Sequence, residues 1–111
     1  MIFVTGPLFS GKKAAVMHLF HWDEAQFAQN CTAEVETLAG EREDLEQLAE
    51  ELALRPVVIA SEVGGGVVPM DREERRRREA AGRLAVLLAG RADTVIRVFC
   101  GIPTVLKGEL P

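Results

Sequence analysis

Short apolar runs alternate with longer amphipathic segments along the chain. Three apolar runs have the length and character of buried strands: Ile2-Phe3-Val4, Val57–Ala60 and Thr94–Cys100. Three segments repeat apolar residues at the spacing of an amphipathic helix: residues 12–20, 41–54 and 71–89. The order strand, helix, helix, strand, helix, strand predicts an α/β fold with a mainly parallel sheet of three or four strands.

Local signals indicate where several of these elements begin or end. Arg55-Pro56 should stop the second helix, because proline cannot continue it. Asp71 and Glu74 have the spacing of a capping box at the start of the third helix, and Gly90 is its expected stop. Residues 31–37 alternate between apolar and polar side chains, which fits either an edge strand or a loop.

Length and composition exclude several classes of protein. The 111 residues are expected to form one domain (1–111), and 48% hydrophobic with 27% charged residues excludes a disordered or fibrous chain. No apolar run approaches the roughly 18 residues of a membrane helix, and the N-terminal residues do not resemble a signal peptide. Two isolated cysteines, Cys31 and Cys100, are typical of a reduced cytoplasmic protein, with a disulfide as the less favoured alternative.

The formal net charge of −4 is unevenly distributed. Residues 14–54 carry ten acidic side chains and one basic one, whereas residues 72–97 carry eight basic and four acidic ones. The overall acidity argues against a nucleic-acid partner, and the basic segment predicts a nearby anion or the acidic half of another subunit. Pairing of these segments and of open sheet edges would give a homo-oligomer.

Candidate chemistry begins with a loop that fits G-x-x-x-x-G-K between a predicted strand and a predicted helix. The loop consists of Gly6, Pro7, Leu8, Phe9, Ser10, Gly11, Lys12 and Lys13. Its glycines allow backbone N–H groups to point at phosphate oxygens, the helix N-terminus adds positive potential, and Lys12 would reach the β- and γ-phosphates. The motif predicts a small three-layer P-loop (RecA-like) fold that binds GTP or ATP.

Two positions of this loop depart from the usual pattern. Pro7 has no N–H to offer a phosphate. Lys13 stands where a Ser or Thr hydroxyl usually ligates Mg²⁺. We expect its ammonium to replace part of that metal contact, so that nucleotide binding depends less on Mg²⁺. No resident metal site is expected elsewhere, because His18 and His21 have no companion ligands at metal-binding spacing.

Glu62 is the second candidate, at the C-terminal end of the strand 57–60. In a parallel sheet that edge adjoins the phosphate site, where a carboxylate can orient a water or accept a proton from an attacking hydroxyl. The alternative is a carboxylate that only caps its loop. Gly64-Gly65-Gly66 would let the following segment pass close to a ligand.

The third constellation is an arginine-rich helix start. Its candidate phosphate or subunit contacts are Arg72, Arg75, Arg76, Arg78 and Arg83. The alternative is a solvated helix face, or pairing with the acidic helix 41–51. His18 is expected at the surface of the helix 12–20, and His21 lies at that helix's end beside Trp22.

Several segments resemble the adenosylcobinamide kinase/adenosylcobinamide-phosphate guanylyltransferase family, over about residues 1–20 and 45–108. Residues 60–69 are similar to its N-E-V-G-x-G-I-V-P signature, and the first strand and loop are similar to its I-L-V-T-G-G-A-R-S-G-K-S. The arginines with Gly82-Arg83 match its arginine helix, and Gly101-Ile102-Pro103 with Lys107 resembles its S-G-I-P…K.

The resemblance implies a transferase of cobalamin biosynthesis. Members phosphorylate the aminopropanol hydroxyl of adenosylcobinamide and then form adenosylcobinamide-GDP through a GMP–histidine intermediate, and a trimer is implied. Lys12 and Glu62 are then the catalytic candidates, and His21 is a candidate GMP acceptor. The family's middle section, with its guanylylated histidine, has no aligned counterpart here, and Ser61 and Ala85 replace two asparagines. Two alternatives follow: a nucleotide-binding accessory protein of the corrinoid pathway, or a non-enzymatic oligomeric interaction module.

Overall fold

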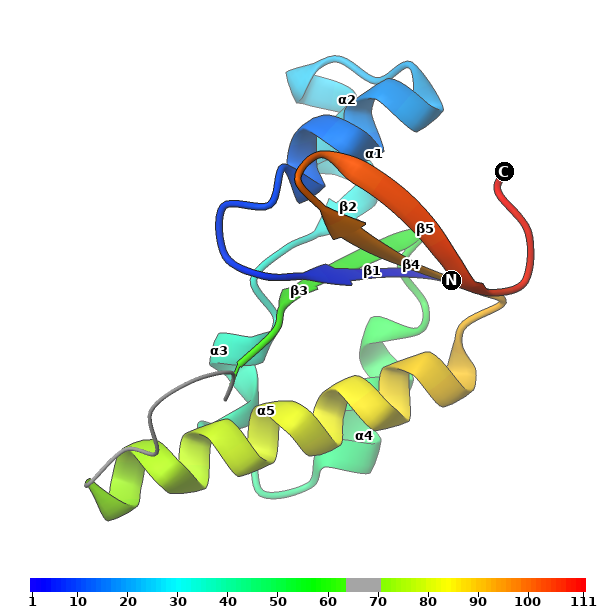
Figure 1. Ribbon diagram of the computed structural model, residues 1–111. Helices are drawn as coiled ribbons and strands as arrows, with labels where there is room; N and C mark the ends of the chain where they lie inside the picture. The colour runs from blue at the N-terminus through cyan, green and yellow to red at the C-terminus, as the bar shows by residue number, and fades with distance from the viewer. Residues whose placement is uncertain (64–70) are drawn as a thin grey trace.

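The computed structural model describes residues 1–63 and 71–111 (Figure 1). Its elements in chain order are β1 (Ile2–Gly6), α1 (Lys12–Phe20), α2 (Glu24–Asn30), β2 (Cys31–Thr32), α3 (Glu36–Ala39), α4 (Leu45–Leu52), β3 (Val57–Ser61), α5 (Arg72–Arg91), β4 (Thr94–Phe99) and β5 (Ile102–Lys107). The predicted role of Gly64-Gly65-Gly66 lies outside the described residues and stays a prediction.

The strands form one sheet in the order β2-β3-β1-β4-β5. The pairs β2/β3, β3/β1 and β1/β4 are parallel, and only β4/β5 is antiparallel. The mainly parallel α/β sheet is confirmed, but the expected three or four strands are five. The strand that the hydrophobic pattern did not predict is β5, which follows Gly101 and contains Pro103; at an edge strand a residue without an N–H is tolerated.

Alternate residues of the strands face two separate hydrophobic layers, which makes the fold three-layered. Phe3 and Val58 face the layer built from α3, α4 and α5. Val4 and Ile59 face the opposite layer, where α1 and α2 contribute Val16 and Phe27. Figure 1 shows the two groups of helices on opposite sides of the sheet. The period-two alternation of a strand therefore serves both layers.

The helix boundaries differ from the expected ones where side-chain caps decide them. Helix α2 was not expected; Asp23 and Gln26 form a capping box at its start, and Phe27 is its buried residue. Helix α4 begins after Asp44, whose carboxylate caps it, rather than at residue 41. Helix α5 begins after Asp71 as expected, although the carboxylate accepts from the N–H of Glu73, and it continues through Gly90 to Arg91.

The segment 31–37 is neither the strand nor the loop expected. Cys31 and Thr32 pair with β3 as a two-residue strand, Glu34 turns the chain with a φ of 58°, and α3 begins at Glu36. The cysteines are free thiols: Cys100 is exposed, whereas burial raises the pKa of Cys31 to about 11. Within the described part of the chain, no helix is both long and apolar enough to cross a membrane.

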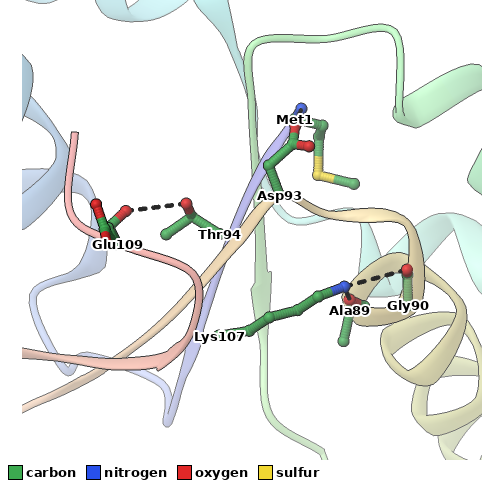
Figure 2. A network of polar contacts seen from close by, with 7 residues as sticks. All are labelled: Met1, Ala89, Gly90, Asp93, Thr94, Lys107 and Glu109. Carbon is green, nitrogen blue, oxygen red and sulfur yellow. Dashed lines mark hydrogen bonds and ion pairs between the residues drawn. The ribbon is translucent and has the colours of Figure 1, made fainter.

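Several hydrogen bonds and one ion pair lie at the amino ends of β1 and β4 (Figure 2). The Met1 amine contacts the Asp93 carboxylate at 2.9 Å, and the Thr94 hydroxyl donates to the Glu109 carbonyl at 2.9 Å. Lys107 Nζ donates to the carbonyls of Ala89 and Gly90 at 3.0 and 3.2 Å. A cation at these carbonyls stabilises the C-terminus of α5, so Lys107 has a structural role here.

Candidate functional site

The loop between β1 and α1 lies at the opposite, carboxyl end of the parallel strands. Gly11 caps α1 with a left-handed φ of 87°, and Phe9 turns the loop at a φ of 59°. A Cβ on Gly6 would stand 2.2 Å from the Val98 carbonyl oxygen and 2.9 Å from Ser10 Oγ. The close approach of β4 therefore requires glycine at the start of the loop.

Among the described residues, two side chains of this loop have few partners: Lys12 has no ion pair, and Ser10 has no hydrogen bond. Lys12 Nζ turns back onto the loop and donates to the Pro7 carbonyl at 2.6 Å. Burial lowers the pKa of Lys12, and the charges of Glu36 and Glu62 oppose this shift. The hydroxyl of Ser10 is buried, and no hydrogen-bond partner is found for it among the described residues. A phosphate oxygen would accept hydrogen bonds from both side chains, as the sequence predicts for this loop.

A cavity of about 560 Å³ adjoins the loop on the side of α1 and α2. The loop residues form one wall of this cavity. Met17, Phe27 and Ile59 supply apolar surface, and Glu24 and Glu34 supply carboxylates. Its volume suits a small-molecule ligand of nucleotide size.

Glu62 lies near the loop as predicted, but it is not free. Its backbone N–H donates to the Gly6 carbonyl at 2.8 Å. Its two carboxylate oxygens accept from Arg97 Nε at 2.5 Å and Arg97 Nη2 at 3.0 Å. The hydrogen bond from Arg97, then the charges of Arg97 and Lys12, lower the pKa of Glu62 against the opposing effect of burial. Glu62 is thus held as a carboxylate.

Arg97 and Glu36 also lie at this site, although the sequence pattern did not indicate them as candidates. Arg97 is the one charged residue in the apolar run Thr94–Cys100, a signal that marks a special position on a predicted strand. Glu36 accepts a hydrogen bond from the Ser61 N–H at 2.7 Å and acts on Lys12 through its charge. It lies in the segment 31–37 whose structure the pattern left open, so no sequence signal placed it beside the loop.

Lys13 points away from the Pro7 carbonyl that holds Lys12, toward α2. Its ammonium contacts the Glu24 carboxylate at 2.8 Å and lies 5.2 Å from the centre of the Phe27 ring. Side chains on both sides of this ion pair are more than half exposed, so the pair is weak and can open. No hydroxyl ligand for Mg²⁺ stands at position 13, and among residues 1–63 and 71–111 no His, Cys, Asp and Glu side chains group as a metal site.

The remaining candidates lie on α1 or just after it and along α5. His21 is exposed at the far end of α1, whose nine residues place it about 13 Å along the helix axis from Lys12. On α5, Arg76 pairs with Glu73 and Arg78 with Glu74, so these arginines have partners on their own helix. Pairing with the acidic helix, one of the alternatives for the arginine run, occurs through a residue outside that run: Arg91 contacts Glu50 at 3.3 Å.

Two comparisons with known proteins bear on this chain. A model of the family described as cobinamide kinase / cobinamide phosphate guanyltransferase matches residues 16–106. The bifunctional adenosylcobalamin biosynthesis protein CobP of Pseudomonas aeruginosa (strain PAO1) is 40% identical over 72 residues, which are 65% of this chain and 42% of that protein. The matched part is thus less than half the length of this curated relative. The family match begins inside α1, so the loop 6–13 is identified by its own motif and geometry.

Proposed function

The chain belongs to the cobinamide kinase / cobinamide phosphate guanyltransferase family, and from this premise we propose that it binds a nucleoside triphosphate at the loop 6–13 and transfers a phosphoryl group to a cobinamide hydroxyl in cobalamin biosynthesis. The observation that carries the proposal is Lys12. Its ammonium is partly desolvated and donates to a carbonyl of its own loop, an acceptor that a phosphate would replace.

The proposed chemistry is mainly electrostatic. Lys12 and the N-terminal N–H groups of α1 stabilise the negative charge on the terminal phosphates, while the loop holds them in line with the attacking hydroxyl. The hydroxyl oxygen bonds to the γ-phosphorus as the bond from that phosphorus to the β–γ bridging oxygen breaks. The nucleoside diphosphate is the leaving group, and the hydroxyl proton passes to water. Glu62 enters as an ionised orienting group rather than as a base, because Arg97 engages both of its oxygens and lowers its pKa. The cavity beside the loop offers apolar and carboxylate surface to the substrates.

The loop of this chain differs from the usual phosphate-binding loop at the position that ligates Mg²⁺. Position 13 offers an ammonium, which cannot ligate a metal, and that ammonium contacts the Glu24 carboxylate. We therefore propose that Lys13 leaves Glu24 when a triphosphate binds and supplies part of the positive charge otherwise brought by the metal. GTP or ATP should then bind in EDTA with an affinity within about threefold of that in Mg²⁺, and Lys13→Ser should restore a dependence on Mg²⁺.

Calorimetric titration tests the binding step directly. The intact chain should bind GTP or ATP, and Lys12→Ala should weaken that binding by about 10- to 100-fold, the value of a charge-assisted contact. Arg91→Met is the matched control: it removes a cation that pairs with Glu50 in a different part of the fold, and it should leave affinity unchanged. Failure of the intact chain to bind either nucleotide would refute the proposal.

Turnover then separates two functions. Incubation with adenosylcobinamide and GTP or ATP should give a phosphorylated corrinoid, detected by mass spectrometry, and Lys12→Ala should abolish it. Nucleotide binding without product would favour the accessory protein, which the Lys13 replacement and the position of His21 support. An acid-labile GMP adduct that is lost in His21→Ala would instead extend the proposal to guanylyl transfer.

Self-association and a cytoplasmic location stay predictions from the sequence. The described sheet has an edge at β2 and another at β5, and exposed arginines extend along the start of α5. We propose that copies of the chain associate through such surfaces. Light scattering that gives the mass of a monomer at micromolar concentrations would contradict this.

A further inference from the structure

The ion pair between Glu62 and Arg97 spans the strand that carries the candidate loop. Arg97 lies on β4 opposite Thr5 of β1, and the Glu62 N–H binds the Gly6 carbonyl at 2.8 Å. The Val98 carbonyl lies so close to Gly6 that it excludes a Cβ there. Both partners are therefore fixed to the backbone where the phosphate-binding loop begins.

The geometry of the pair leaves one edge of the guanidinium open. Glu62 accepts from Nε and Nη2, and the Phe99 ring lies 5.4 Å from Arg97 Cζ. A guanidinium has five N–H donors, and this side-on contact uses one from each of these two nitrogens. In the described part of the chain no acceptor contacts Nη1, and the Arg97 side chain is 40% exposed. An arginine held in this way has donors set for a planar or tetrahedral anion.

The charges around the pair also point to an anion. The charges of Glu62 and Lys12 each affect the pKa of the other group, so the Lys12 ammonium and the ion pair interact electrostatically. Glu62 offsets the charge of Arg97, and the pair can persist without ligand while its open donors remain available. Lys12 has no ion-pair partner within salt-bridge distance among the described residues. A triphosphate placed at Lys12 would bring negative charge toward the open edge of Arg97.

We propose that Arg97 is a phosphate-binding residue, a proposal that rests on the nucleotide site proposed above. The open edge of its guanidinium donates to the β- and γ-phosphates, while Glu62 holds the guanidinium in orientation. Glu62 then acts as a positioning residue through Arg97. This assigns a function to a charged residue within the apolar strand β4, and it accounts for the bidentate contact that keeps Glu62 from acting as a base.

Titration of paired ligands tests this assignment. Affinities for GTP, tripolyphosphate and GMP are measured by calorimetry, with GMP measured by displacement of GTP at millimolar concentration. Arg97→Met should weaken GTP and tripolyphosphate by about 10- to 100-fold and GMP by less than about threefold. Arg97→Lys should fall between these values, because an ammonium keeps the charge but not the bidentate geometry.

Matched variants distinguish binding from folding. Arg91→Met is the control, since Arg91 is also 40% exposed and also pairs with a glutamate, and its affinities should equal those of the unaltered chain. Glu62→Gln should weaken GTP binding, and the Glu62→Gln/Arg97→Met double variant should bind no more weakly than Arg97→Met alone. Melting curves identify folded variants; if Arg97→Met does not fold, Arg97→Lys and Arg97→Gln are judged by the same ratio of GTP to GMP.

Two results would overturn the assignment. If folded Arg97→Met binds GTP with unchanged affinity, Arg97 does not contact the phosphates. If GMP and GTP lose affinity equally, the substitution disturbs the whole loop instead. Both differ from failure of the proposed function itself. In that case the unaltered chain itself binds no triphosphate, so Arg97→Met has no affinity to lose.

Discussion

At the amino end of the sheet, Lys107 donates to two carbonyls at the end of α5, and the buried Thr94 hydroxyl donates to Glu109. At the carboxyl end, the one described hydrogen bond of the Lys12 ammonium is to a carbonyl of its own loop, and the buried Ser10 hydroxyl has no described partner. Each end has a lysine and a buried hydroxyl. Buried polar groups normally have partners, so the end where the buried hydroxyl has no described partner is the end suited to a ligand.

Two glycines give the strongest test of this comparison. A Cβ on Gly6 would meet the Val98 carbonyl at 2.2 Å and Ser10 Oγ at 2.9 Å; a Cβ on Gly108 would meet the Asp93 carbonyl at 2.2 Å and Thr94 Oγ1 at 2.9 Å. Gly6→Ala and Gly108→Ala should each lower the free energy of unfolding by about 2–4 kcal/mol, measured by urea denaturation.

Their effects on ligand binding should differ. Gly6→Ala displaces the loop and should abolish measurable GTP binding in the fraction that still folds, whereas folded Gly108→Ala should bind GTP as the unaltered chain does. Calorimetry of both variants below their melting temperatures checks this. Equal losses of affinity would mean that the two ends of the sheet do not act separately.

Two lysines give the next largest effect. Lys107→Met removes the cation from the C-terminus of α5 and should cost about 1 kcal/mol of stability without changing GTP affinity. Lys12→Met should leave stability unchanged or raise it, because burial lowers the pKa of Lys12 and so disfavours its charged form. It should nevertheless weaken GTP binding. A destabilised Lys12→Met variant would show that Lys12 supports the fold.

The two buried hydroxyls give a smaller effect of the same kind. Thr94→Val removes a hydrogen bond and leaves the Glu109 carbonyl unpaired, so it should cost about 1 kcal/mol of stability. Ser10→Ala removes a hydroxyl that has no described partner, and it should cost less than about 0.5 kcal/mol while weakening GTP binding. Urea denaturation and calorimetry measure both quantities. A larger stability loss in Ser10→Ala than in Thr94→Val would reverse the comparison.

The sequence predicts the local parts of this molecule well. The strand, loop and helix around Gly6, Gly11 and Lys12 were predicted because each depends on residues a few positions apart. Helix α2 was missed because it buries only Phe27, so its apolar periodicity is weak and its capping box is the main signal. Strand β5 was missed because its side chains are mostly exposed and carry no alternation.

The site itself was predicted only in part, and distance along the chain explains the difference. Lys12 and Glu62 stand in motifs, but the partners that set their state do not. Arg97 reaches Glu62 across 35 residues, and Glu36 reaches Ser61 across 25. Such contacts depend on strand order and register, which the pattern of one sequence leaves open. The ionisation of Glu62 is therefore a property of the fold.

The pH dependence of stability gives the smallest and most selective test. A hydrogen bond from Arg97 lowers the pKa of Glu62 at the carboxyl end, and a hydrogen bond from the Met1 amine lowers the pKa of Asp93 at the amino end. Each folded pKa lies below its unfolded value. Each carboxylate therefore stabilises the fold fully well above about pH 4.3 for Glu62 and 3.9 for Asp93, and this contribution is lost as the pH falls further.

Asp93→Asn and Glu62→Gln should each flatten the decline in stability that urea denaturation measures between about pH 6 and pH 3. Tripolyphosphate distinguishes the two ends. Bound beside Arg97 and Lys12, it adds negative charge near Glu62, which favours the protonated carboxyl and moves the Glu62 contribution toward higher pH. The Asp93 contribution should not move. A ligand-induced shift that persists in Glu62→Gln but disappears in Asp93→Asn would place the anion at the amino end, where Asp93, Thr94 and Lys107 already have partners (Figure 2).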